Sequence, residues 1–210
     1  MLADAEERNG TRWGRGLAVL VPTAVAAGFV GVAITQGALA AGFNVADQPF
    51  EMRVSELQGN GLGVVIGAAN VKSADGSVSQ KAVLHAGLNS ADIAGLCLIA
   101  KQNFMGAAYS VLLSAGGDER AGGRNVMFDV TDLDATPAVL SGALLGRSAD
   151  EIFAAGQSLG GEPGGFGLDV GEGQATLSNV KATAVNAQVV GSLSVPHLKM
   201  SLVPGEATGC

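Results

Sequence analysis

The sequence predicts an all-β domain, either an antiparallel sandwich or an elongated curved sheet, preceded by one N-terminal apolar helix. Several stretches alternate apolar and polar residues with a period of two, which is typical of a strand with one buried face. Glycine occurs 32 times in 210 residues, and its clusters suit the positive-φ positions of turns. Amphipathic helices do not alternate with the strands, which disfavours a parallel α/β sheet.

The N-terminal segment has the features of a membrane-directed sequence. No charged residue occurs between Arg15 and Asp47. The apolar run that begins at Leu17 spans roughly 20 residues, which is enough to cross a bilayer. Arg12 and Arg15 precede the run, an arrangement that leaves the following chain outside the membrane. We therefore expect the rest of the protein to be exported.

The end of this segment carries a processing signal. Ala38 and Ala40 fit the small-x-small pattern of a signal-peptidase site, which would make Ala41 the new N-terminus. The length of the run equally suits a retained anchor. The sequence thus predicts that residues 1–40 are a signal peptide or a transmembrane anchor, and that residues 41–210 form a single exported β-rich domain, either secreted or membrane-anchored.

Composition and charge narrow the function classes. The chain is 48% hydrophobic and 15% charged, which favours a folded domain over a disordered one. Residues 1–40 hold three of the twelve basic and three of the nineteen acidic residues, so the whole net charge of −7 belongs to the exported part. Nucleic acid is therefore not an expected partner, because that binding depends on Lys and Arg.

The alternation is clearest in four stretches, which we predict as strands: Phe50–Val54, Tyr109–Leu113, Val126–Val130 and Leu198–Leu202. Glycine-rich clusters, among them Gly59-Asn60-Gly61, predict turns between strands.

One local pattern predicts a helix. Ser148-Ala149-Asp150-Glu151 is a capping-box pattern, in which Ser and Glu satisfy each other's free amides. Gly156 is placed to end the turn. These residues predict a short helix at roughly 149–155.

Cys97 and Cys210 are the only cysteines. In an oxidising compartment two cysteines most simply form a disulfide, here closing a loop of more than 100 residues. A buried free Cys97, or an exposed Cys210 that pairs between chains, are the alternatives. The pair is interpreted as structural rather than catalytic.

A catalytic pattern also occurs. Gly156–Gly160 matches the G-x-S-x-G nucleophile elbow around Ser158, and Asp169 and His197 follow in the order found in α/β-hydrolases. The elbow requires a buried strand before the serine and a helix after it. The predicted helix before Ser158, and Pro163 with its neighbouring glycines after it, do not fit that frame. A serine lipid esterase is therefore the alternative hypothesis, not the leading one.

No metal or cofactor is predicted. With His85 and His197 as the only histidines, and no Cys pair or H-E-x-x-H pattern, a zinc site has no support. Asp129, Asp132 and Asp134 suggest a calcium loop, but the glycine and terminal glutamate of an EF-hand are missing. Solvated acids at a strand edge explain these three residues better.

Three segments carry a family resemblance: Gln36–Ala41, Val130–Leu133 and Leu198–Leu202. With them the chain resembles an actinobacterial exported family of unknown function, whose members often carry the label "cholesterol esterase". The resemblance covers most of the chain, including both cysteines. It implies an envelope or secreted protein, often linked with small multi-span membrane proteins. It supplies no catalytic residues, so the label does not extend to this chain.

The leading hypothesis is a non-enzymatic, exported cell-envelope protein that binds an apolar or lipid ligand, or assembles with itself or with a membrane partner. The expected partners are the membrane through the N-terminal segment, a lipid, a second copy of the chain or a small multi-span membrane protein. A purely structural surface-layer component is a third hypothesis.

Overall fold

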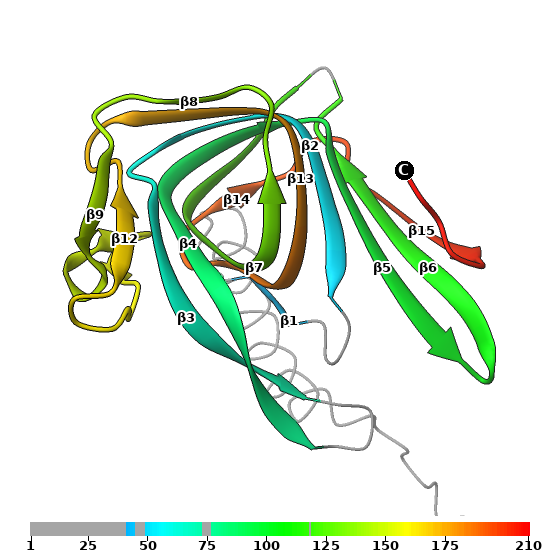
Figure 1. Cartoon of the computed structure of the whole chain (residues 1–210). Helices are drawn as coiled ribbons and strands as arrows, with labels where there is room; N and C mark the ends of the chain where they lie inside the picture. The colour runs from blue at the N-terminus through cyan, green and yellow to red at the C-terminus, as the bar shows by residue number, and fades with distance from the viewer. Residues whose placement is uncertain (1–40, 45–48, 73–76, 118) are drawn as a thin grey trace, which may run out of the picture. The chain divides into compact units, whose positions relative to one another are not determined.

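The computed structural model describes residues 41–44, 49–72, 77–117 and 119–210, which all belong to the compact unit Leu39–Cys210 (Figure 1). The prediction of a signal peptide or anchor at residues 1–40, with Ala38 and Ala40 at its processing site, lies outside these described residues. Within the described ranges no helix has the length and apolar character needed to span a membrane.

The prediction of an all-β, antiparallel domain is confirmed. In the described part of the chain, thirteen strands form one sheet, β10 and β11 form a separate hairpin, and the helical element is the short 3-10 turn η1 (Ala149–Glu151). The strands are β1 (Ala41–Asn44), β2 (Phe50–Asn60), β3 (Gly63–Lys72), β4 (Val78–Ala94), β5 (Leu96–Phe104), β6 (Ala107–Ala115), β7 (Ala121–Asp134), β8 (Ala138–Leu140), β9 (Leu144–Ser148), β10 (Phe153–Ala154), β11 (Gln157–Ser158), β12 (Phe166–Asp169), β13 (Gln174–Val189), β14 (Leu193–Ser194) and β15 (Lys199–Pro204).

Glycines bend two long strands at the centre of the sheet. β2 and β3 together form one long strand, and β4 and β5 form a second. These two long strands pair with each other in antiparallel direction, and the register does not shift along their length. Gly61 lies between β2 and β3 with φ 66°, and Gly95 lies between β4 and β5 with φ 62°. A side chain would strain the backbone at either position. The predicted turn at Gly59-Asn60-Gly61 is therefore wrong, because positive φ here bends the strand without reversing the chain.

Four strands close into a ring. β13 pairs with β2 on one side and with β7 on the other, β7 pairs with β4, and Glu56–Asn60 of β2 pair with Ser90–Ala94 of β4. The structure is thus a single curved sheet that closes on itself, rather than two packed sheets. The predicted strands Phe50–Val54 and Val126–Val130 direct their apolar residues into the ring. The core there includes Phe50, Met52, Val54, Leu57, Leu88, Ile93, Val126, Phe128, Val130, Leu177 and Val180.

Beyond Gly95 a second part of the sheet leaves the ring. We call the three strands β5, β6 and β15 the flap (Figure 1). The predicted strands Tyr109–Leu113 and Leu198–Leu202 lie in the flap, although β15 begins at Lys199. The side chains of Met200 and Leu202 are 64% and 65% exposed, so the alternation there does not mark a buried face.

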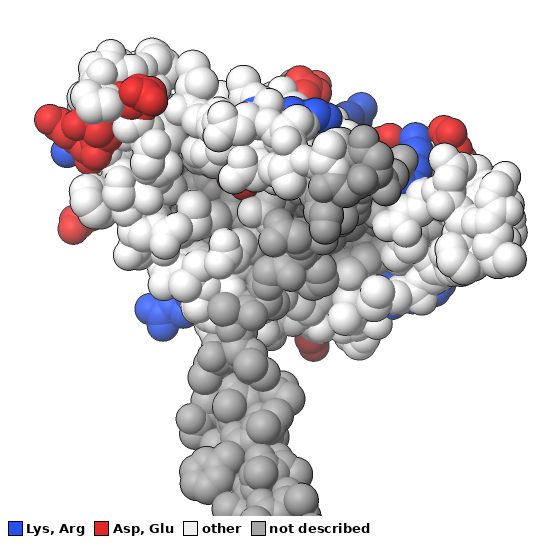
Figure 2. Space-filling model, turned by 90° about the horizontal axis from the view of Figure 1, so that it is seen from below, with Lys and Arg blue, Asp and Glu red and all other residues white. Residues whose placement is uncertain are grey.

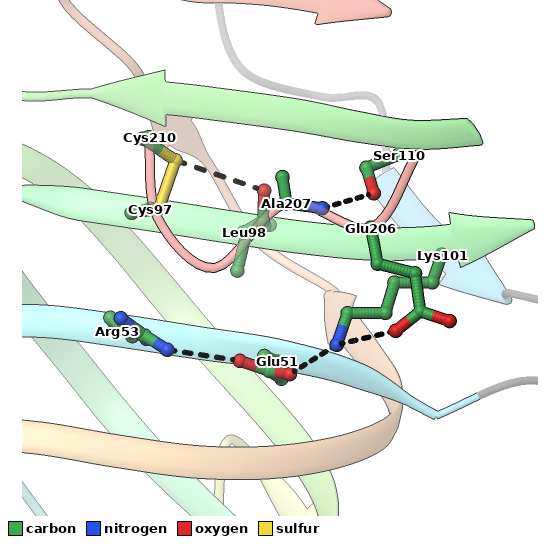
Figure 3. A network of polar contacts seen from close by, with 9 residues as sticks. All are labelled: Glu51, Arg53, Cys97, Leu98, Lys101, Ser110, Glu206, Ala207 and Cys210. Atoms are coloured by element: carbon green, nitrogen blue, oxygen red, sulfur yellow. Dashed lines mark hydrogen bonds and ion pairs between the residues drawn. A yellow bond between two sulfur atoms is a disulfide. The ribbon is translucent and has the colours of Figure 1, made fainter. Parts of the chain in front are cut away.

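The C-terminal residues lie across one face of the flap, held by several bonds (Figure 3). Cys97 and Cys210 form the predicted disulfide within the chain. The Ser110 hydroxyl is fully buried, donates to the Gly205 carbonyl at 2.8 Å and accepts from the Ala207 amide at 2.8 Å. The chain therefore covers this face with its own terminus.

The segment that contains η1, β10 and β11 packs on the outside of the ring. Ile152 is fully buried there with Val65, Ala149, Ala154 and Leu159. Gly63 and Gly87 leave the space for this cluster, since a Cβ on Gly63 would lie 2.7 Å from Ile152 and one on Gly87 would lie 2.9 Å from Leu159.

The predicted helix at 149–155 is wrong beyond its first turn. Three residues form a 3-10 turn, after which Phe153 and Ala154 form a strand. Ser148 makes no capping bond, since its hydroxyl contacts Asp150 and accepts from the Gly164 amide at 2.8 Å. Burial of Ile152 against the glycines of the sheet stabilises the extended path more than one isolated helical turn would.

Ile152→Ala should destabilise the fold by about 2–5 kcal/mol, because it leaves a cavity in a fully buried cluster. The neighbouring Phe153 is 69% exposed, so Phe153→Ala should change stability by less than about 0.5 kcal/mol. Urea unfolding of both variants measures the difference. Equal effects would show that the outer cluster is not part of the cooperative core.

Removing the disulfide should destabilise the protein, because residues 113 apart in the chain are no longer joined when it unfolds. A chain-entropy estimate for such a loop is about 4–5 kcal/mol, an upper value for the measured loss. The double variant Cys97→Ser, Cys210→Ser and the reduced wild type should unfold at the same, lower urea concentration. An unchanged urea midpoint in both the double variant and the reduced wild type would show that the disulfide does not stabilise the fold.

Candidate apolar binding site

An apolar cavity of about 130 Å³ lies between the ring, the flap and the segment that precedes β15, residues 193–198. Three groups of side chains line it: Met52, Phe128 and Val189 from the ring, Leu96, Leu98 and Leu113 from the flap, and Leu193, Val195 and Leu198 from the segment. The site is thus assembled from strands that are far apart in the sequence.

Two glycines of β7 pair with the segment before β15. Gly122 and Gly123 line the cavity and pair with Ser194 and Leu193 in β14. Backbone bonds fix this segment at both ends, from the Arg124 amide to the Ser192 carbonyl at 2.9 Å and from the Gly116 amide to the Pro196 carbonyl at 3.1 Å. The segment forms a wall of the cavity held by backbone bonds, which leaves its apolar side chains available for contact.

The side chains that line the cavity favour hydrocarbon groups over polar ones. None of the lining side chains carries a hydroxyl, carboxyl, imidazole or amide group. A polar group placed in such a site loses its bonds to water without replacement, at a cost of roughly 2–7 kcal/mol. An apolar group gains about 25 cal/mol for each Å² removed from water. The cavity therefore favours an alkyl or isoprenoid fragment and excludes a headgroup.

The size of the cavity limits what enters. Its volume is about 130 Å³, close to the roughly 150 Å³ of a dry engineered cavity that takes up benzene. A short hydrocarbon fragment fits this space, but a long hydrocarbon chain does not. The remainder of such a ligand has to lie outside the cavity.

The structure places the residues of the esterase hypothesis in separate settings. Ser158 is exposed on β11, and its hydroxyl accepts from the Gly160 amide at 3.3 Å. Asp169 is buried on β12 and accepts from Arg147 at 2.5 Å and from the Gly171 amide at 2.7 Å. His197 is exposed in the turn before β15. No hydrogen bond or ion pair within the described ranges joins any two of Ser158, Asp169 and His197.

The other candidate metal ligands do not form a single group. On the outside of the ring, Asp129 accepts from Asn186 at 3.1 Å, and one of its oxygens lies 2.6 Å from Nδ1 of His85. Asp132 and Asp134 are exposed near the end of β7. Across the described residues no three His, Cys, Asp or Glu side chains are grouped closely enough to hold a metal ion.

An ion-pair network links the C-terminal residues to the ring (Figure 3). Lys101 on β5 lies 3.1 Å from Glu51 on β2 and 3.7 Å from Glu206. The hydrogen bond from Lys101, helped by Arg53, lowers the pKa of Glu51 below its ordinary value of 4.5, against the opposing effect of partial burial. The network joins β2 of the ring to β5 and to the C-terminal residues, on the face of the flap opposite the cavity.

These features define a class of protein: an antiparallel β-domain with a disulfide-held C-terminus and an apolar cavity. Residues 46–210 match the model of a family of unknown function, DUF6230, and the chain belongs to this family. No curated protein and no solved structure matches the chain. The family description assigns no activity, so the function has to be argued from the site.

The Lys101→Met variant should lose less than about 1 kcal/mol at neutral pH, because the pair is partly exposed. The lowered pKa of Glu51 means that its contribution is present above the unfolded value and is lost as the pH falls through the folded value. The stability difference from wild type should therefore shrink below about pH 4.5. Urea unfolding from pH 7 to pH 3 tests this, and a constant difference would contradict it.

Proposed function

We propose that this protein is a non-enzymatic, exported cell-envelope protein that binds the hydrocarbon tail of a lipid. The observation that carries the proposal is a cavity lined only by apolar side chains and glycines, next to the apolar face of the flap. The lining supplies no group that would hold a polar ligand or take part in acid–base chemistry.

The energetics favour a ligand that is longer than the cavity. Each buried methylene contributes about 0.8 kcal/mol. A micromolar dissociation constant corresponds to about 8 kcal/mol, so roughly ten methylenes have to leave water. A cavity of about 130 Å³ holds fewer than that. A tail that enters the cavity and continues along the flap would reach this affinity.

The disulfide and the charge distribution agree with an exported location. A Cys97–Cys210 bridge persists in oxidising compartments and is rare in the cytosol. The uncharged stretch that follows Arg15 acts, under this proposal, as the segment that directs the chain across the membrane. Under this proposal residues 1–40 deliver the domain to the outer side of the membrane.

Binding is favoured over hydrolysis by the settings of the three candidate catalytic residues. The Asp169 carboxylate is engaged by Arg147, and Ser158 belongs to a short hairpin on the outside of the ring. Neither residue lines the cavity. A lipid tail held in the cavity therefore meets none of the groups that the esterase hypothesis requires.

Binding of cis-parinaric acid, a fatty acid whose fluorescence rises in apolar surroundings, tests the proposal. The wild-type protein should give a saturable signal. Val195→Trp should weaken binding by about tenfold or more, since the larger side chain fills the cavity and excludes at least two methylenes, each about 0.8 kcal/mol.

Val203→Trp is the matched control. Val203 has the same half-buried character and lies on β15, but it pairs with Ser110 on the face of the flap opposite the cavity. This variant should bind the probe like wild type. No saturable signal from wild type, or equal loss in both variants, would overturn the proposed function.

A further inference from the structure

The apolar face of the flap begins inside the cavity and continues outward. Strand register aligns Leu98, Leu113 and Met200 in one row across β5, β6 and β15. The next row on the same face holds Ala100, Val111 and Leu202, because side chains two residues apart share a face. The row beyond these, toward the turn, holds Gln102, Tyr109 and Pro204. Leu98 and Leu113 line the cavity, so a mainly apolar face runs from the cavity toward the end of the flap.

The two faces of the flap differ in cover. On the face beneath the C-terminal residues, Ile99 is 1% exposed and Ser110 is fully buried. On the opposite face Met200 and Leu202 remain 64% and 65% exposed. Among the described residues, the chain thus covers one face of the flap and leaves the apolar face open.

The turn at the end of the flap exposes large apolar side chains and carries no charge. Phe104 and Met105, at the turn between β5 and β6, are 67% and 91% exposed. No charged residue occurs between Lys101 and Asp118. Figure 2 shows the flap, at the right, as a surface with a broad area free of charged side chains. Transfer of such a turn into the interface of a bilayer requires no charge to be desolvated.

Strand directions place this turn on the same side of the ring as the start of the domain. β5 runs antiparallel to β2, with Ile99 opposite Glu51, so Phe104 lies beyond the end of β2 at Phe50. β1 extends beyond the same end, because it pairs with β13 past the pair of Phe50 and Ala184. The flap turn and β1 therefore project in one direction.

The start of the domain is also next to the cavity. Ala41 pairs with Val189, which lines the cavity. Ala41 directly follows the segment predicted to lead to or remain in the membrane, residues 1–40. A retained segment would keep the domain close to the bilayer. A cleaved segment would leave the apolar face of the flap free to reach it.

We infer that the apolar face of the flap docks on the surface of a lipid bilayer, with Phe104 and Met105 entering it, so that a lipid tail passes along this face into the cavity. The inference rests on the proposed function and adds the partner of the same site. The domain has a net charge of −7, which disfavours an anionic surface. The bilayer that fits is one of neutral, zwitterionic phospholipid.

Contact with lipid is measured by tryptophan quenching in the full-length protein. The single tryptophan is first removed by Trp13→Phe, and Phe104→Trp then places a reporter at the flap turn. In vesicles of phosphatidylcholine with brominated acyl chains, the Phe104→Trp protein should lose most of its emission relative to vesicles of unbrominated phosphatidylcholine.

The matched control is Phe153→Trp in the same background. Phe153 is 69% exposed, close to the 67% of Phe104, but lies on the outer cluster of the ring. Its emission should be nearly unchanged by bromination. No quenching at position 104, or equal quenching at both positions, would overturn the docking.

Three further outcomes separate the hypotheses. A blue shift of the Phe104→Trp emission that grows with protein concentration, without vesicles and without quenching by brominated lipid, would assign the face to a second copy of the chain and overturn the inference. If cis-parinaric acid still binds while quenching is absent, the docking fails and the proposed function stands. If quenching is present and the probe does not bind, the proposed function fails.

Discussion

The structure depends on how β2 shares its two hydrogen-bonding edges. One edge pairs with β13, and the other pairs first with β5 and then with β4. Because β4 and β5 are one strand bent at Gly95, the same strand closes the ring and begins the flap. The pairing with β7 ends at Ile93, just before this bend, and Leu96 and Leu98 beyond it line the cavity. The cavity is therefore a consequence of ring closure.

The C-terminal residues determine which face of the flap stays open. The disulfide to Cys97 and the bonds of Ser110 hold them against one face, so Ile99 is buried there. The other face continues from the cavity to Phe104 without a covering element in the described residues. A small cavity joined to a long apolar surface suits a flexible hydrocarbon chain better than a compact ligand, because the chain buries area in both places.

Local patterns predicted where the strands lie. They predicted the burial of the apolar strand faces correctly in the ring but not in β15. The alternation at Phe50–Val54 and at Val126–Val130 marks buried faces, as expected, because both strands belong to the ring. The alternation at Leu198–Leu202 marks a strand whose apolar side is largely exposed. The residues of the capping-box pattern at Ser148 form only a 3-10 turn. Ile152 packs against glycines of the sheet instead, and the local sequence contains no sign of this contact.

The sequence by itself determined the strand-rich, all-β character of the domain, because alternation is a local pattern. It favoured the disulfide, because two cysteines have only one intramolecular pairing. The tertiary structure alone decided that Gly61 bends a strand, that four strands close a ring, and that Leu98 and Val195 meet across a cavity. An alternation of apolar and polar residues with a period of two indicates that one face of a strand is apolar. It does not record which strand lies beside it, since that depends on hydrogen bonds between residues far apart in the chain.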